Sequence, residues 1–141
     1  MTKSSQHHFV LVLKSQPQQV AKVEAFLRRV NRAARLSNEE FNKLLVVATE
    51  AVNNGILHGN KQHPEKHVTL TCTLHGGKLE IRIHDEGSGF NADDLPDPLA
   101  QENLFREHGR GVFLMRSLME SVVFEHTGKG ADVIMTMRIN Q

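Results

Sequence analysis

The spacing of apolar residues divides the chain into strands and helices. Apolar and polar residues alternate strictly from His67 to His75, which predicts a half-buried strand. Gly76 and Gly77 make a two-residue hairpin turn, and the returning strand carries apolar residues at 79, 81 and 83. A short apolar run at 9–14 predicts a first strand, and two last strands are expected near 121–126 and 131–139.

Two long segments instead have helical spacing. Between 16 and 35, apolar residues recur three and four positions apart, as on one face of an amphipathic helix. A second helix is expected over 39–58. Ser37 or Asn38 offers an N-cap for it, and Gly59 is expected to supply its C-cap.

A third, short helix is expected from Gly111 to about Met119, after a long irregular stretch from Glu86 to His108. The element order is therefore strand, two helices, hairpin, long loop, helix and hairpin. Hairpin-joined strands form a mostly antiparallel sheet, so we expect the α+β class, as a two-layer α/β sandwich with the helices on one face. The chain is short and lacks repeats or linkers, so residues 1–141 are expected to form a single domain.

Composition limits the partners and the cellular location that can be expected. The formal net charge is +1 and no long basic stretch occurs, so direct nucleic-acid binding is not expected. The sequence contains no apolar run of the roughly 18 residues that a membrane span requires. The N-terminus has no signal-peptide core, and the single cysteine, Cys72, suits a reducing compartment, so a cytoplasmic location is expected. Cys72 lies in the alternating strand and is interpreted as a buried hydrophobe.

Glu50 and Asn54 form the first candidate site. They are four residues apart, so they share one face of the second helix. They are expected to lie opposite the core face, which is assigned to Phe41, Leu45, Ala48 and Val52. A carboxylate and an amide among apolar neighbours suit a pocket wall, as a general base and an oxygen ligand for Mg²⁺. The alternative interpretation is a solvated polar face.

Asp85, Gly87 and Gly89 form the second candidate site, at the end of a strand. Asp85 is in phase with the apolar positions of that strand, so it is expected to point toward the helices. A buried carboxylate needs a hydrogen-bond donor, and the amino group of adenine is a suitable one. The two glycines would let the backbone turn sharply and approach a flat ring. The alternative is a plain turn in which Asp85 caps its own backbone.

Gly109, Arg110 and Gly111 form the third candidate site, directly before the expected third helix. Free backbone N–H groups and the helix dipole favour an anion there, and Arg110 could add charge. The alternative is a flexible joint at a helix start.

Together, these three segments resemble the Bergerat-type ATP-binding fold shared by gyrase, Hsp90, sensor histidine kinases and the DNA-repair MutL proteins. Glu50 and Asn54 resemble the asparagine box of that group, and Asp85-x-Gly-x-Gly resembles its adenine-binding box. Gly109-Arg110-Gly111 resembles its second glycine box.

Within that group, the stretches TEAVNNGILHGN and GRGVFLMRSLM are most similar to the stand-alone serine kinases that act as anti-sigma factors. The resemblance implies that Glu50 is the catalytic base, that Asn54 holds Mg²⁺, and that Asp85 binds the amino group of ATP. It also implies that Gly109 and Gly111 face the phosphates. The expected partners are an antagonist protein carrying a phosphorylatable serine and a sigma factor. A homodimer through the helix-free face of the sheet is a further expectation.

One departure from the family pattern and one competing function remain open. The family often closes its pocket with Gly-x-Gly-Thr, whereas this chain has Gly128, Lys129, Gly130, Ala131 and Asp132. The competing function is an ATP-binding regulatory module that sequesters a partner without phosphoryl transfer, which would need no base at Glu50. A P-loop ATPase is not expected, because no GxxxxGK[ST] motif occurs.

Overall fold

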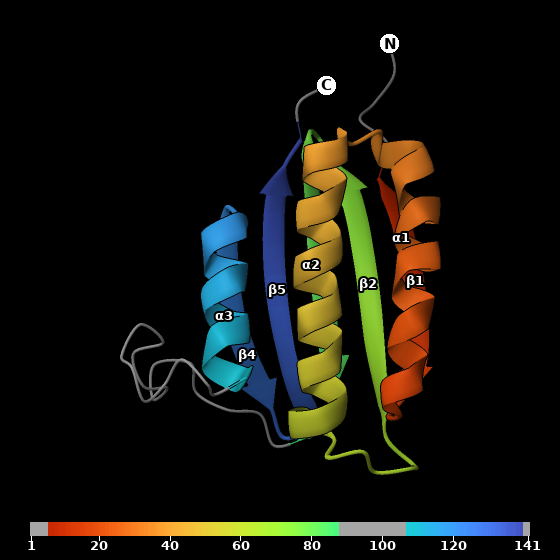
Figure 1. Cartoon of the computed structure of the whole chain (residues 1–141), viewed down its shortest axis with the longest axis vertical. Coiled ribbons are helices and arrows are strands. Elements are labelled where there is room, and N and C mark those ends of the chain that lie inside the picture. The colour runs from red at the N-terminus through yellow and green to blue at the C-terminus, as the bar shows by residue number, and fades with distance from the viewer. Residues whose placement is uncertain (1–5, 88–106, 140–141) are drawn as a thin grey trace.

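The computed structural model describes residues 6–87 and 107–139, which form a five-stranded sheet with helices on one face (Figure 1). The strand order is β1-β2-β3-β5-β4, and every neighbouring pair is antiparallel. The strands are β1 (His7–Lys14), β2 (His67–His75), β3 (Lys78–Asp85), β4 (Ser121–Thr127) and β5 (Gly130–Arg138). The predicted two-layer α+β sandwich is therefore confirmed.

The helical layer contains α1 (Ala21–Ala34), α2 (Asn38–Asn54) and α3 (Glu107–Leu118). A short 3₁₀ turn, η1 (Pro17–Val20), precedes α1, and a π-helical turn, η2 (Gly55–Gly59), continues α2. In Figure 1, α2 lies over the middle of the sheet and runs along the strands, with α1 and α3 on either side of it.

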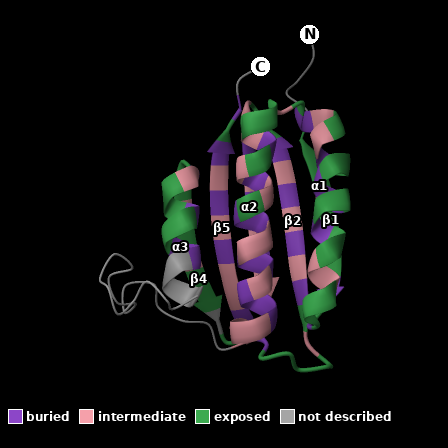
Figure 2. Cartoon of the chain, in the orientation of Figure 1, coloured by how far each residue is buried: buried purple, intermediate pink, exposed green. Residues whose placement is uncertain are grey.

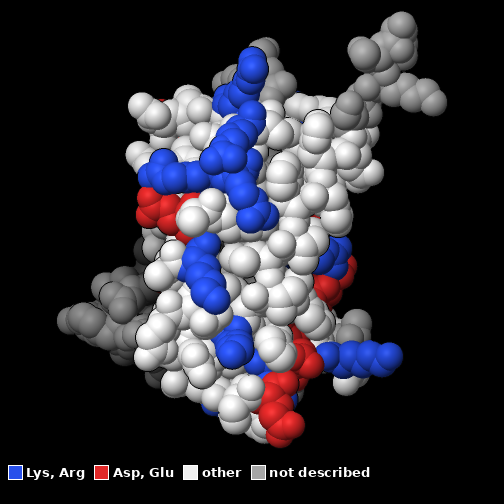
Figure 3. Space-filling model, turned by 90° about the vertical axis from the view of Figure 1, so that its right-hand side faces the viewer, with Lys and Arg blue, Asp and Glu red and all other residues white. Residues whose placement is uncertain are grey.

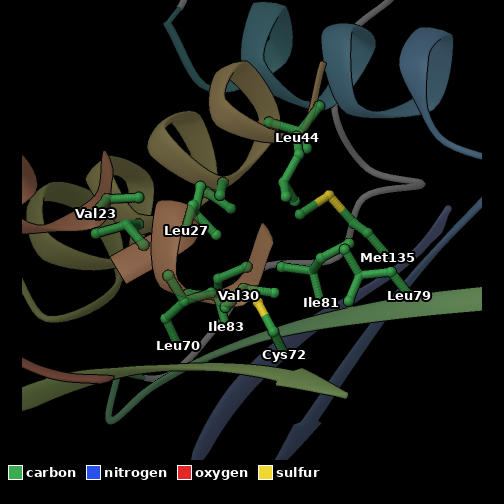
Figure 4. Packing of buried hydrophobic residues seen from close by; sticks show 14 of the residues in the cluster. Val23, Leu27, Val30, Leu44, Leu70, Cys72, Leu79, Ile81, Ile83 and Met135 are labelled. Atoms are coloured by element: carbon green, nitrogen blue, oxygen red, sulfur yellow. The ribbon is translucent and has the colours of Figure 1, made fainter. Parts of the chain in front are cut away.

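One hydrophobic cluster fills the space between the two layers (Figures 2 and 4). Strand β2 alternates buried and half-buried residues as predicted, and Leu70 and Cys72 are fully buried. Val23, Leu27 and Val30 of α1 pack onto the same cluster. Burial raises the pKa of the Cys72 thiol to about 12, so this cysteine behaves as a small hydrophobe.

Ser37 is the N-cap of α2. Its hydroxyl accepts a hydrogen bond from the Glu40 backbone N at 3.1 Å, and Glu40 Oε1 accepts one from the Ser37 backbone N at 2.8 Å. This reciprocal capping box satisfies two helix-end N–H groups, and losing such a cap typically costs about 1 kcal/mol. It fixes where α2 starts and therefore which of its residues reach the pocket.

Two expectations for α2 were wrong. Gly59 is not a C-cap, because the chain continues through the π turn and the Asn60 backbone N donates to Gly55 O at 2.8 Å. The core face is also wider than predicted. Leu45 is only half-buried, and the buried residues are Phe41, Leu44, Val47, Ala48, Ala51, Val52 and Asn54. Asn54 therefore lies at the edge of the core rather than opposite it.

Candidate nucleotide site

Asn54 and Asp85 line one pocket at the end of the sheet where α2 meets η2. Its wall also includes His58 and Gly59 of η2, Met115 of α3 and Ala131 of β5. The pocket thus combines residues of both layers, and two of the three candidate sites share it. Apolar walls with a few convergent polar groups are typical of a small-molecule site.

Asn54 is buried, with 8% of the residue exposed. Within the described residues, its side-chain amide makes no hydrogen bond. An amide at a pocket wall that has no protein partner can bond to water or to a ligand there. Its oxygen is a hard donor of the kind Mg²⁺ prefers, so the group fits a metal–phosphate ligand.

Asp85 extends from the end of β3 toward the helical layer, as its phase predicted. Its Oδ1 accepts a hydrogen bond from the Gly87 backbone N at 2.8 Å, so it also caps its own turn. Burial raises the pKa of the Asp85 carboxyl, although that hydrogen bond and the nearby His84 oppose the shift. With one oxygen occupied by Gly87, the other remains available as an acceptor in the pocket.

Gly59 brings η2 directly against Asp85. A Cβ atom at Gly59 would overlap the Asp85 carboxyl group, so only glycine permits this approach. The glycine that the sequence suggested as a helix cap therefore serves the pocket.

Gly111 joins the first and third candidate sites. A Cβ placed on Gly111 would lie 3.0 Å from Asn54 Nδ2 and 3.2 Å from Glu50 Oε2. Helix α3 thus packs its glycine against the polar pair of α2. Glu50 is half-buried, and it has no ion pair among the described residues.

The third candidate site was expected directly before its helix, but the structure places it inside that helix. Helix α3 begins at Glu107, so Gly109, Arg110 and Gly111 lie within its first turns. The physical reason is that tertiary packing against α2 overrides the low helix propensity of glycine. Gly89 of the second site lies outside the described residues.

A family model for the histidine kinase-like ATPase domain matches residues 13–137. This chain belongs to that family. The anti-sigma F factor of Oceanobacillus iheyensis is 32% identical to this ATPase domain over 106 residues, which make up 73% of this chain and 73% of that protein. The serine-protein kinase RsbW of Listeria monocytogenes is 26% identical over 137 residues, or 93% of this chain and 87% of that protein.

A solved structure of the RsbU and RsbW domains of a Mycobacterium tuberculosis protein has the same fold. Its TM-score is 0.71 over 96% of this ATPase domain, at 15% sequence identity. This chain spans 33% of the length of that longer chain. The resemblance drawn from the sequence motifs is therefore confirmed at the level of family and fold.

Asn60, to which the sequence motifs gave no role, holds this end of the ATPase domain together. Its side chain is 1% exposed and donates to Ser15 Oγ at 2.8 Å and to His67 O at 3.0 Å. Its Oδ1 accepts from the Glu86 backbone N at 2.7 Å. Asn60 thus fixes the segment directly after Asp85 to the end of η2. Asn60 ends the stretch TEAVNNGILHGN that carried the family resemblance, but no role was assigned to it.

Asp132 lies in the Gly130-Ala131-Asp132 segment, which differs from the family pattern. Its carboxylate contacts two side chains of the neighbouring strand. Its oxygens lie 2.6 Å from Arg82 Nη1 and 2.5 Å from His84 Nδ1. Both partners are on β3, the strand that carries Asp85. The acid therefore ties the start of β5 to the strand end that forms the pocket, while Ala131 lines the pocket wall.

The described residues contain neither a helix that could span a membrane nor a cluster of metal-ligating side chains. No helix there has the length and apolar character needed to cross a membrane. No cluster of three or more His, Cys, Asp or Glu side chains in that part of the chain could hold a metal ion. A magnesium ion bound here would depend on few protein ligands.

Proposed function

We propose that this ATPase domain is an ATP-dependent protein-serine kinase that acts as an anti-sigma factor. It would phosphorylate a serine on a small antagonist protein and sequester a sigma factor when that antagonist is unavailable. The observation that carries the proposal is the convergence of Glu50, Asn54 and Gly111 beside the pocket that contains Asp85. The names of the relatives, an anti-sigma F factor and a serine-protein kinase, support it.

In this proposal, Asp85 selects the base of ATP. The carboxylate oxygen not bonded to Gly87 accepts a hydrogen bond from the adenine amino group, and Gly59 lets the chain approach closely. Asn54 would hold Mg²⁺ through its amide oxygen, a hard ligand of the kind that this cation prefers. Gly87 and Gly89 are the proposed glycines beside the base, and Gly109, Arg110 and Gly111 are the proposed phosphate-side residues.

Glu50 is the proposed general base. It lies next to Gly111, close to Asn54, and this proposal assigns those two residues to the phosphate side of the nucleotide. Its carboxylate takes the proton from the serine hydroxyl of the antagonist as the serine oxygen bonds to the γ-phosphorus. The bond between that phosphorus and the β–γ bridging oxygen breaks, and ADP leaves. The chemistry that Mg²⁺ would supply when bound is neutralisation of charge on the transferred phosphate.

The competing proposal is a module that binds ATP and sequesters its partner without transfer. It requires the pocket but not the carboxylate of Glu50. The position of Glu50 beside Asn54, half-buried and without an ion pair among the described residues, favours the kinase.

We further propose a cytoplasmic homodimer that pairs through the helix-free face of the sheet. Thr69, Thr71 and Thr73 lie on that face, and β1 adds Val10 and Val12 opposite Thr71 and Thr69. The two valines are 50% and 57% exposed. Covering these apolar side chains with a second copy would stabilise a dimer, because it removes apolar surface from water.

The test is phosphate transfer by Glu50 variants to an antagonist recovered from the source cell by ATP-dependent pull-down. Glu50→Ala should leave ATP affinity near the parental value and slow transfer by about 10²–10⁴-fold. Glu50→Gln keeps the contact with Gly111 but removes the base, so it should be equally slow. If both variants transfer at the parental rate, the base is wrongly assigned. If the parent transfers no phosphate, the sequestering module replaces the kinase.

A further inference from the structure

Positive charge is concentrated on helix α1. Helix α1 and its C-cap carry five of the 17 basic residues of the chain but one of its 16 acidic residues. The remaining chain then has 12 basic and 15 acidic residues, so the small net charge of +1 hides a separation of charge. Figure 3, which looks onto the side where α1 lies, shows lysine and arginine side chains gathered along it.

Four of these residues, all exposed, form what we call the arginine band: Arg28, Arg29, Arg32 and Arg35. Arg28 is paired with Glu24 at 2.5 Å. No ion pair or hydrogen bond from the other three side chains is found within the described residues. The band therefore presents unneutralised guanidinium groups to its surroundings.

Two members of the band are held in place by aromatic rings. The Arg28 guanidinium lies 5.0 Å from the centre of the Phe41 ring, and that of Arg29 lies 5.4 Å from the Phe26 ring. Such stacking restricts a long side chain, which lowers the entropy lost when it binds a ligand. Helix-dipole stabilisation favours cations only in the last turn, so it does not account for Arg28 and Arg29.

The band is separate from the nucleotide site, because α1 contributes no residue to the pocket wall. Arg28 to Arg35 spans roughly 10 Å along the helix axis, at about 1.5 Å per residue. This length matches two turns of a helix with carboxylates along one side. Guanidinium groups bind carboxylates through paired hydrogen bonds.

We propose that the arginine band is a docking surface for an acidic helical segment of a partner protein. A nucleic acid fits less well, because it needs many phosphate contacts along an extended basic track. The basic surface also ends soon after the band, because Glu39 and Glu40 begin the next helix and the chain beyond α1 is net acidic. The proposal does not depend on phosphoryl transfer, so it stands or falls separately from the kinase function.

The probe is a fluorescently labelled synthetic helical peptide of about three turns with glutamates four apart, compared with the same peptide carrying glutamines. The acidic peptide should bind the parent protein, more weakly as salt rises, and the glutamine peptide should not. The variant Arg29→Gln/Arg32→Gln/Arg35→Gln should bind it about tenfold more weakly, as expected from losing three exposed ion pairs. Unchanged ATP affinity would show that this variant is folded.

Matched single charge reversals separate local docking from general attraction. Arg32→Glu should weaken peptide binding clearly more than Lys61→Glu, which changes the net charge equally but lies outside the band. Equal effects of the two reversals would overturn the proposal, as would parental affinity in the triple variant. Binding of the parent to an oligonucleotide or an anionic vesicle but not to the acidic peptide would also overturn it.

Discussion

Replacing Asp85 with asparagine separates nucleotide recognition from folding stability. The Gly87 backbone N–H already donates to Oδ1 of Asp85, at 2.8 Å. In Asp85→Asn, the amide oxygen should keep that bond, because the amide NH₂ cannot accept it. The NH₂ group then takes the position of the second carboxylate oxygen, which faces the pocket. Two hydrogen-bond donors, this NH₂ group and the amino group of adenine, would therefore face each other.

The affinity for ATP should fall accordingly. One mismatched buried hydrogen bond costs about 1–3 kcal/mol, which corresponds to roughly 5- to 150-fold weaker binding. The loss should be the same for ADP, because Asp85 is proposed to contact the base and not the γ-phosphate.

The free energy of unfolding without nucleotide should change in the opposite direction. Burial raises the pKa of Asp85 above its usual 3.8, so the folded protein holds this proton more tightly than the unfolded chain does. The stability contributed by the protonated group is fully present below the unfolded pKa and is lost as pH rises through the folded one. Because asparagine cannot ionise, Asp85→Asn should gain stability over the parent near neutral pH, and the gain should vanish in acid.

Two measurements test this reasoning. Calorimetric titration with ATP and ADP gives the affinities, and urea unfolding between about pH 3.5 and pH 7.5 gives the stability difference. Equal nucleotide affinity in variant and parent would remove Asp85 from the site. Lower stability of Asp85→Asn at neutral pH would refute the account of its burial.

Three further predictions address the metal, the helix contact and the dimer. Asn54→Ala should make ATP affinity nearly insensitive to Mg²⁺ in calorimetry, and an unchanged Mg²⁺ response would place the metal elsewhere. Gly111→Ala should raise the melting temperature, since alanine in a helix gains up to about 1 kcal/mol over glycine. The same change should slow phosphate transfer, because its Cβ would crowd Asn54 and Glu50 at 3.0 and 3.2 Å; parental transfer rates would contradict this. Light scattering should detect a species heavier than the 15.9 kDa monomer, lost in Val12→Glu but not in the helix-face control Val46→Glu; a monomeric parent would refute the dimer.

Much of the fold could be predicted from the sequence because its elements are locally regular. The strict alternation of β2 and the Gly76-Gly77 turn determined the register of the first hairpin, in which His75 pairs with Lys78. The pairing of β3 with β5 joins segments far apart in the chain, and no periodicity encodes it directly. The expectation that hairpin-joined strands form one sheet did not specify this pairing.

The candidate site was predicted in parts. The phase of β3 correctly placed Asp85 on the helical side, and the four-residue spacing placed Glu50 and Asn54 on one face of α2. The depth of Asn54 was not predicted, because the width of an apolar stripe depends on what packs against the helix. The start of α3 was misplaced because two glycines argued against a helix, and the contact with α2 that stabilises it is long-range.

The polar groups that hold the pocket in shape were the least predictable part. Asn60 bonds to Ser15, His67 and Glu86, which come from three different segments of the chain. Ser15 lies just before η1 and α1, and Glu86 directly follows Asp85. One buried amide thus links the entrance of α1, the end of η2 and the strand end that carries the adenine-binding candidate. Each of these hydrogen bonds is buried or half-buried. Moving one segment would therefore leave a polar group without a partner, at a free-energy cost of about 1–3 kcal/mol. The close approach of Gly59 to Asp85 is therefore held by a network as well as permitted by the absence of a side chain.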